Sequence, residues 1–157
     1  MAGGKTLIAY ATKSSATEEY TSVIEKVLRD KYGLEVDVVN LRENKKPDFT
    51  PYSNIIIGSG VRRGKWYKEA KKFLKNDFGD RKVAIFLASL RAGIPEMYDE
   101  AVKKYIKDVL AKYSHIKLVA AEAFGGIKKK KGRIILDLRD PAKASAWAEE
   151  LGKKLSE

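Results

Sequence analysis

The sequence contains no cysteine and a single histidine, His115. The absence of cysteine excludes disulfides, thiolate nucleophiles, iron–sulfur clusters and thiolate zinc sites. One histidine is too few for a histidine-rich metal site, and His115 lies outside the loops considered below, so we expect a structural role for it. Any redox chemistry of this chain must therefore be carried by a bound organic cofactor.

Long apolar runs are also missing. The first residues, MAGGKTLIAYA, lack the longer apolar core and the cleavage pattern of a secretion signal. No stretch approaches the roughly 20 consecutive apolar residues of a membrane span. We therefore expect a cytoplasmic protein without a membrane span.

Length and charge set further limits. A chain of 157 residues is long enough for one domain with a large core, so residues 1–157 are expected to form a single domain. The sequence shows no low-complexity tract and no internal repeat. Its net charge of +11 favours an acidic partner surface.

Strand-like and helix-like segments alternate along most of the chain. Ile55, Ile56 and Ile57 are consecutive and flanked by Asn54 and Gly58, as is typical of a central parallel strand covered on both faces. The five expected strands are residues 6–11, 34–38, 55–57, 83–87 and 116–123. Apolar spacings of three and four predict helices between them, over 20–28, 70–74 and 98–113, and a last one over 144–155. The alternation predicts an α/β fold with a mostly parallel, doubly wound sheet and helices on both faces.

The segment after the fifth strand departs from this alternation. Gly125, Gly126 and the lysine run 128–131 lead through Gly132 into an apolar stretch at 133–138. That stretch could pair as one arm of a hairpin, or it could extend the fifth strand after an insertion. A lysine run of this kind is usually a solvated hairpin tip.

Three loops follow the first, third and fourth expected strands, at residues 12–17, 59–66 and 88–93. In a doubly wound sheet the carboxyl ends of parallel strands meet at one edge, where ligands bind. The first loop, ATKSSAT, has no glycine-rich dinucleotide motif and no Walker A motif, and GxSxG occurs nowhere in the chain. Its hydroxyls and the amides of the following helix suit a phosphate, although Ser15 with Glu18 could also form an ordinary capping box.

The hydroxyl residues Thr12, Ser14 and Thr17 resemble the phosphate loop of flavodoxins, with Ser15 where glycine is usual. Together with IIIGSGVRRGKWYKEA at 55–70, the loop resembles the flavodoxin-domain subfamily that includes the bacterial protoporphyrinogen dehydrogenases. The resemblance spans residues 6–155. It implies a three-layer flavodoxin-like fold with five parallel strands in the order 2-1-3-4-5, and FMN as the cofactor.

The resemblance also implies which residues contact FMN. The phosphate would be enclosed by Thr12, Lys13, Ser14, Ser15, Ala16 and Thr17. One side of the isoalloxazine would lie along Ser59, Gly60, Val61, Arg62, Arg63, Gly64 and Trp66. Its pyrimidine edge would contact the backbone of Ser89, Leu90, Arg91, Ala92 and Gly93. Trp66 or Tyr67 would stack on one ring face, and the other face would be open or covered by Leu90 or Tyr98.

Arg62 and Arg63 are unusual because flavodoxins are usually acidic. Cations near the flavin would stabilise its anionic reduced form. We therefore expect the potential of the semiquinone/hydroquinone couple to be less negative than in an acidic flavodoxin.

Three functions remain open. The first is an electron carrier that docks to an acidic redox protein, as a monomer or homodimer. The second is an FMN-dependent dehydrogenase in which Arg62 or Arg63 holds substrate carboxylates. The third is a flavin-free binding module that uses residues 128–131 and Arg133 on nucleic acid or anionic lipid. Nucleic acid is disfavoured, because the lysines lack the interleaved aromatics that stack on bases.

Overall fold

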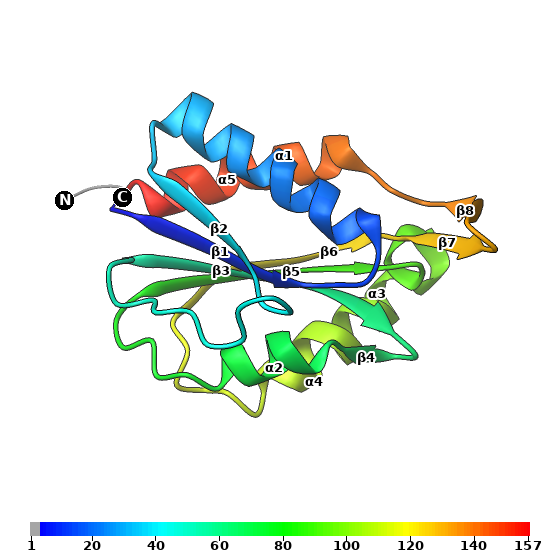
Figure 1. Cartoon of the computed structure of the whole chain (residues 1–157), viewed down its shortest axis with the longest axis horizontal. Helices are drawn as coiled ribbons and strands as arrows, with labels where there is room; N and C mark the ends of the chain where they lie inside the picture. The colour runs from blue at the N-terminus through cyan, green and yellow to red at the C-terminus, as the bar shows by residue number, and fades with distance from the viewer. Residues whose placement is uncertain (1–3) are drawn as a thin grey trace.

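Five parallel strands form the central sheet of the computed structural model, which describes residues 4–157. Their order in space is β2-β1-β3-β5-β6, and every neighbouring pair is parallel (Figure 1). In chain order these strands are the first to the fifth parallel strand, so the predicted order 2-1-3-4-5 is confirmed. Their bounds are β1 Thr6–Ala11, β2 Val36–Asn40, β3 Asn54–Arg62, β5 Lys82–Ser89 and β6 Leu118–Gly125.

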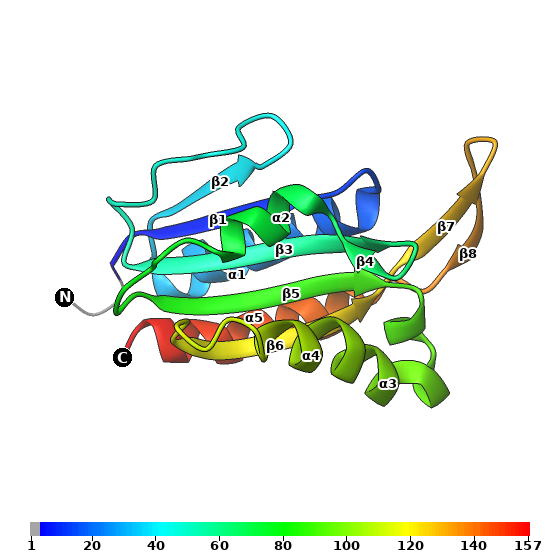
Figure 2. The same cartoon turned by 90° about the horizontal axis from the view of Figure 1, so that it is seen from below.

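Helices cover both faces of the sheet, which gives three layers (Figures 1 and 2). One face carries α1 (Ser15–Tyr32) and α5 (Pro141–Leu155). The other carries α2 (Lys68–Leu74) and a helical stretch made of α3 (Tyr98–Val102), a π-helical turn (Lys103–Lys107) and α4 (Asp108–Leu110). The single long helix expected over 98–113 is therefore interrupted by a π turn and ends at Leu110.

Local signals in the sequence explain where α1 and α5 begin and end. Gly33 ends α1 in the left-handed conformation, with φ 61°, and its amide bonds to the carbonyls of Arg29 and Leu28. Asp140 caps α5 by accepting a hydrogen bond of 3.0 Å from the Lys143 amide, and Pro141 occupies the first turn.

The core lies in two layers, one on each side of the sheet. Ile55 and Ile57 pack into the layer under α2, and Ile56 packs into the layer under α1 and α5. All three are fully buried. This is the arrangement expected of a central strand whose successive side chains point to opposite, equally covered faces.

Two hairpins project from the carboxyl end of the sheet. In the first, β4 (Lys65–Trp66) folds back on β3 through Arg63 and Gly64, whose φ angles are 52° and 77°. The segment expected as a loop at 59–66 is thus a strand end followed by a hairpin. In the second, β7 (Ile127–Lys130) pairs with β8 (Arg133–Asp137), so the hairpin alternative for 133–138 is confirmed and the strand extension is wrong.

No helix among residues 4–157 combines the length and the apolar character needed to cross a membrane.

Candidate functional site

The three predicted loops meet at the carboxyl end of the sheet and enclose a cleft of about 250 Å³. The root of the β7–β8 hairpin forms part of its wall. The lining residues are Thr12, Ser14, Gly60, Val61, Arg62, Gly64, Tyr67, Ala88, Ser89, Leu90, Arg91, Tyr105, Gly126 and Ile127.

The first loop presents the start of α1 without a side-chain cap. Ser14 is the N-cap residue and has an extended backbone, but its hydroxyl bonds to no amide of the first turn. Thr12 Oγ1 instead accepts a hydrogen bond of 2.9 Å from the Ser14 amide. Glu18 Oε1 lies 3.5 Å from the Tyr10 hydroxyl, so the capping box of Ser15 and Glu18 does not form. No side chain of residues 4–157 caps the backbone amides at the positive end of α1, so they are available to a hydrogen-bond acceptor such as an anion.

Thr17, in the first turn of α1, has a fully buried hydroxyl without a hydrogen-bond partner in the described part of the chain. An unpaired buried hydroxyl costs about 1–3 kcal/mol. A Cβ atom built on Gly60 would lie 3.4 Å from Thr17 Oγ1 and 2.8 Å from Thr12 Oγ1. Gly60 thus packs closely against both threonine hydroxyls; Thr12 lines the cleft, whereas Thr17 lies buried behind it. Hydroxyls next to the free amides of a helix start suit a phosphate group.

The second loop is held by Ser59 and places Tyr67 in the cleft. Ser59 is fully buried, and its hydroxyl donates to the Gly60 carbonyl at 2.7 Å and accepts from the Tyr67 amide at 3.1 Å. Trp66 does not line the cleft. It is 7% exposed, and its indole nitrogen donates to the Tyr105 carbonyl at 2.7 Å. Of the two aromatic residues expected at one ring face, Tyr67 lies in the cleft and Trp66 does not; the placement of Trp66 at the cofactor is corrected, because its indole packs in the core.

The third loop contributes Ser89, Leu90 and Arg91 to the cleft, while Ala92 is buried in the core. Tyr98, named as a possible cover for the second ring face, does not line the cleft. Its hydroxyl donates to Glu122 on β6, and burial followed by this bond raises the pKa of Tyr98. Leu90 is the expected cover that lies in the cleft.

The cleft has lining residues that the sequence did not indicate as site residues. Tyr105 comes from the π-helical turn, and its helical spacing marked it only as core. Gly126 and Ile127 come from the hairpin root, where the glycine pair was the available signal. A Cβ on Gly126 would lie 3.2 Å from the Leu90 amide nitrogen, and one on Gly125 would overlap the Leu138 carbonyl. Both positions are occupied by glycine because the hairpin root approaches the third loop so closely that a Cβ atom there would crowd neighbouring backbone atoms.

A second hollow of about 690 Å³ adjoins the cleft and shares Arg62 and Tyr67 with it. We call it the cationic groove; it is lined by Lys13, Arg42, Lys45, Arg62, Arg63, Lys65, Trp66, Tyr67, Lys68 and Glu69. Within residues 4–157, none of its seven cationic side chains forms an ion pair. Lys13 and Arg63, expected at the cofactor, line this groove and not the cleft.

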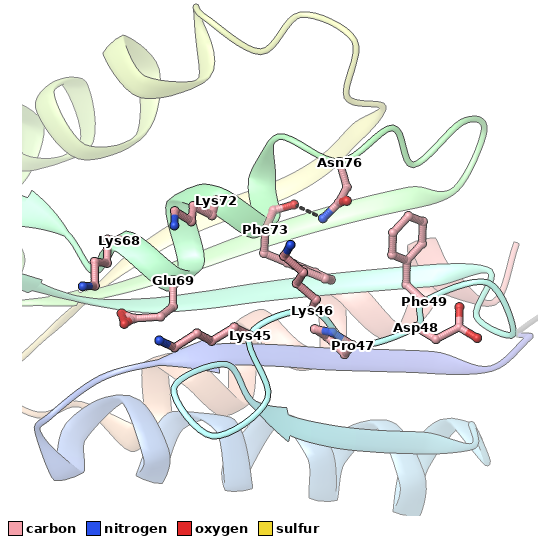
Figure 3. A pocket seen from close by; sticks show the side chains of 10 residues that line it. All are labelled: Lys45, Lys46, Pro47, Asp48, Phe49, Lys68, Glu69, Lys72, Phe73 and Asn76. Carbon is pink, nitrogen blue, oxygen red and sulfur yellow. Dashed lines mark hydrogen bonds between the residues drawn. The ribbon is translucent and has the colours of Figure 1, made fainter.

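A third hollow, of about 550 Å³, continues the positive surface between α2 and the segment before β3 (Figure 3). It shares Lys45, Lys68 and Glu69 with the cationic groove. Figure 3 shows Lys45 and Lys46 on one wall and Lys68 and Lys72 on the other. Positive charge thus extends from the cleft along α2.

Comparisons with known proteins agree with this geometry. A family model described as a flavodoxin domain matches residues 7–134. Protoporphyrinogen IX dehydrogenase (quinone) of Escherichia coli K12 is 26% identical over 109 residues, which are 68% of this chain and 60% of that protein. The chain therefore matches less than two thirds of this relative's length.

Solved structures show the same fold. Oxidised flavodoxin 2 from Bacillus cereus matches with a TM-score of 0.68 and 27% identity, covering 96% of this chain and 99% of that one. A flavodoxin from Fusobacterium nucleatum bound to flavin mononucleotide matches with a TM-score of 0.57 and 20% identity, covering 97% and 99%.

Proposed function

Because the chain belongs to the flavodoxin-domain family, we propose that its cleft binds FMN and that the protein is an electron carrier. The observation that carries this proposal is the buried, unpaired hydroxyl of Thr17 beside the uncapped start of α1. A phosphate at the start of α1 would accept hydrogen bonds from both. Bound FMN would supply the one- and two-electron chemistry, and the protein would supply orientation and electrostatics.

The chain's residues divide into two groups around the cofactor. Thr12, Ser14 and Thr17, with the first amides of α1, would hold the phosphate. The ring would lie between the side that carries Tyr67 and the side formed by Leu90 and the hairpin root. Arg62 is the cation of the second loop that lines the cleft, so it is the one expected to act on the ring.

The cationic groove suits an acidic redox protein as the partner. Its seven cations have no carboxylate at ion-pairing distance among residues 4–157, so they are free to pair with an incoming acidic surface. Because the groove shares Arg62 and Tyr67 with the cleft, docking there would bring the partner next to the ring. Association of this kind accelerates encounter and weakens as salt is added.

The position of the cationic groove next to the cleft also supports a second candidate function, an FMN-dependent dehydrogenase for an anionic substrate. Arg62 and Arg63 could bind substrate carboxylates with paired hydrogen bonds while the substrate contacts the ring. The partial similarity to a protoporphyrinogen IX dehydrogenase points the same way. Incubating the FMN-loaded protein with protoporphyrinogen IX and a quinone, and measuring porphyrin fluorescence, tests it: catalytic turnover supports the enzyme, and none supports the carrier.

Cofactor binding is tested by titrating apoprotein with FMN, riboflavin and FAD. If the phosphate is held as proposed, FMN should bind more tightly than riboflavin by several kcal/mol, the scale of a few charge-assisted hydrogen bonds. Equal affinities for FMN and riboflavin would show that the first loop holds no phosphate. Failure to bind any flavin would leave the flavin-free binding module as the function.

A further inference from the structure

The β7–β8 hairpin exposes three consecutive large apolar side chains. Ile134, Ile135 and Leu136 are 48%, 54% and 41% exposed. Single exposed apolar residues are ordinary on protein surfaces, but a contiguous group marks an interaction site. Three of the six large hydrophobic residues that are exposed among residues 4–157 are gathered on this one short strand.

The hairpin stands apart from the body of the protein. Among the strands of residues 4–157, β7 and β8 pair only with each other, and Figures 1 and 2 show them projecting beyond the carboxyl end of the sheet. Neither core layer contains a residue of β8. The apolar side chains of β8 therefore lie outside the core of the domain.

The base of the hairpin is nevertheless firmly attached. The Leu138 amide donates to the Gly126 carbonyl at 2.9 Å. Arg139 pairs with Asp137 at 2.7 Å and with Glu19 of α1 at 2.8 Å, and its hydrogen bonds lower the pKa of Asp137 to about 2. The hairpin is thus an arm held in a defined direction.

Positive charge surrounds the apolar side chains. Lys128, Lys129, Lys130, Lys131 and Arg133 are all exposed, and none forms an ion pair among residues 4–157. Lys128 lies opposite Leu136, and Lys129 lies opposite Ile134. Cations and apolar side chains are therefore cross-strand neighbours on both sides of the bulge between Lys128 and Lys129.

We propose that the β7–β8 hairpin docks the protein on a lipid bilayer that contains anionic headgroups. The five cations would bind the headgroups, and Ile134, Ile135 and Leu136 would enter the boundary between headgroups and acyl chains. This inference goes beyond the proposed function and does not depend on it. Since Gly126 and Ile127 line the cleft, docking would bring the cleft to the membrane surface.

Other occupants of this surface fit less well. A second copy of the hairpin would bring five cations against five. Nucleic acid would satisfy the cations but would gain nothing from isoleucine, and the hairpin has no aromatic residue for base stacking. An acidic protein would pair with the cations, whereas a bilayer with anionic headgroups offers charge for the cations and an apolar phase for the three aliphatic side chains.

The test is sedimentation with phosphatidylcholine vesicles, with and without phosphatidylglycerol. The wild-type protein should bind only the vesicles that contain phosphatidylglycerol. Lys128→Gln with Lys129→Gln should lower the partition coefficient about tenfold or more, and Ile134→Ser with Ile135→Ser should lower it by a comparable factor. A matched pair on the α2–α4 side, Lys75→Gln with Lys112→Gln, removes the same charge elsewhere and should change binding much less.

Insertion is tested separately because the chain has no cysteine. An environment-sensitive fluorophore on Ile135→Cys should shift to shorter wavelength on phosphatidylglycerol vesicles, and the same label on exposed Ser22→Cys should not. Circular dichroism and FMN titration check that each variant is folded and that any failure is independent of the flavin site.

Several results would overturn the proposal. The wild-type protein could fail to bind the vesicles, or the hairpin variants could bind as well as it does. A label at position 135 that does not shift would show adsorption without insertion. Loss of a wild-type dimer in the isoleucine variant, without vesicle binding, would assign the surface to a second copy, and binding of acidic proteins alone would assign it to such a partner.

Discussion

The hydroxyl of Tyr20 donates a hydrogen bond to the backbone carbonyl of Gly125, 105 residues further along the chain. The same hydroxyl accepts a hydrogen bond of 3.0 Å from the amide of Asp140. Tyr20 lies on α1, whose N-cap residue Ser14 lines the cleft, while Gly125 and Asp140 flank the β7–β8 hairpin. One buried side chain thus connects α1 to both ends of the hairpin segment.

Removing the Tyr20 hydroxyl should weaken the attachment of α1 to both ends of the hairpin segment. Tyr20→Phe leaves the Gly125 carbonyl and the Asp140 amide without their partner, which should lower the free energy of unfolding by about 1–3 kcal/mol. We also expect weaker FMN binding, because the hairpin root lines the cleft. Urea denaturation and FMN titration measure the two effects.

Tyr32→Phe is the matched control for Tyr20→Phe. The Tyr32 hydroxyl donates to the Glu149 carbonyl at 2.7 Å, which joins α1 to α5 away from the cleft. This variant should lose stability but keep its FMN affinity. Equal loss of FMN affinity in both variants would show that the effect is general destabilisation.

The unpaired hydroxyl of Thr17 should contribute to FMN binding and not to folding. Thr17→Val replaces that hydroxyl with a methyl group of similar size, so apoprotein stability should stay the same or rise. FMN affinity should fall by about 1.5–3 kcal/mol, the value of a hydrogen bond to a charged group, while riboflavin affinity should not change.

Thr21→Val is the control for Thr17→Val. Thr21 lies one turn later, and its hydroxyl donates to the Thr17 carbonyl at 2.9 Å. Its loss should leave FMN affinity unchanged. An unaltered FMN affinity in Thr17→Val would contradict a phosphate beside that hydroxyl.

The two arginines of the second loop should differ in their effect on the flavin potential. Arg62 lines the cleft, whereas Arg63 lines the cationic groove alone. Both side chains are exposed, so we expect Arg62→Ala to make the second one-electron potential more negative by roughly 1 kcal/mol, or about 45 mV, with a smaller shift for Arg63→Ala. Potentiometry on the three proteins measures this. No shift for Arg62→Ala would mean that its charge points to solvent.

The charge of the cationic groove should control the reaction with charged electron acceptors. In the FMN-loaded protein, Lys65→Glu should slow reoxidation by anionic ferricyanide and speed reoxidation by cationic hexaammineruthenium(III). The reason is that replacing a cation by an anion makes the electrostatic potential at the groove less positive. Lys26→Glu, an exposed change on α1, alters the net charge equally and should have less effect. Stopped-flow rates at several salt concentrations test this, and equal rates for the two variants would rule out the groove as the entry surface.

Alkaline pH should weaken the contact between Tyr52 and Asp37. The Tyr52 hydroxyl donates to Asp37 Oδ2 at 2.7 Å, and this bond, followed by burial, raises the pKa of Tyr52 from 10.0 to about 12. Because the folded state favours the protonated phenol, the stabilisation is complete below pH 10 and is lost as the pH rises toward 12. Solvent screening limits it to about 1 kcal/mol.

Urea denaturation of the wild type and Tyr52→Phe across that pH range measures the contribution. The stability difference between the two proteins should shrink as Tyr52 ionises. A difference that stays constant would show that the bond to Asp37 does not set this pKa.

Several features were predictable because they depend on local patterns. The consecutive isoleucines 55–57 marked the central strand, and the hydroxyl residues of ATKSSAT marked the turn before α1. The sequence could not choose between Trp66 and Tyr67, because they are neighbours and either could have faced the cleft. The pairing of Trp66 with Val61 decides between them, since it turns the indole toward the Tyr105 carbonyl.

The sequence by itself determined the α/β class, the strand order through the family resemblance, and the exclusion of thiolate chemistry. Each of these depends on residue types or on hydrophobic spacing within one segment. Only the tertiary structure decided which charges lie together: the cationic groove collects side chains from the first loop, the segment before β3, the β3–β4 hairpin and α2. Their spacing along the chain carries no such information, because long-range packing of the parallel strands brings those segments to one edge of the sheet.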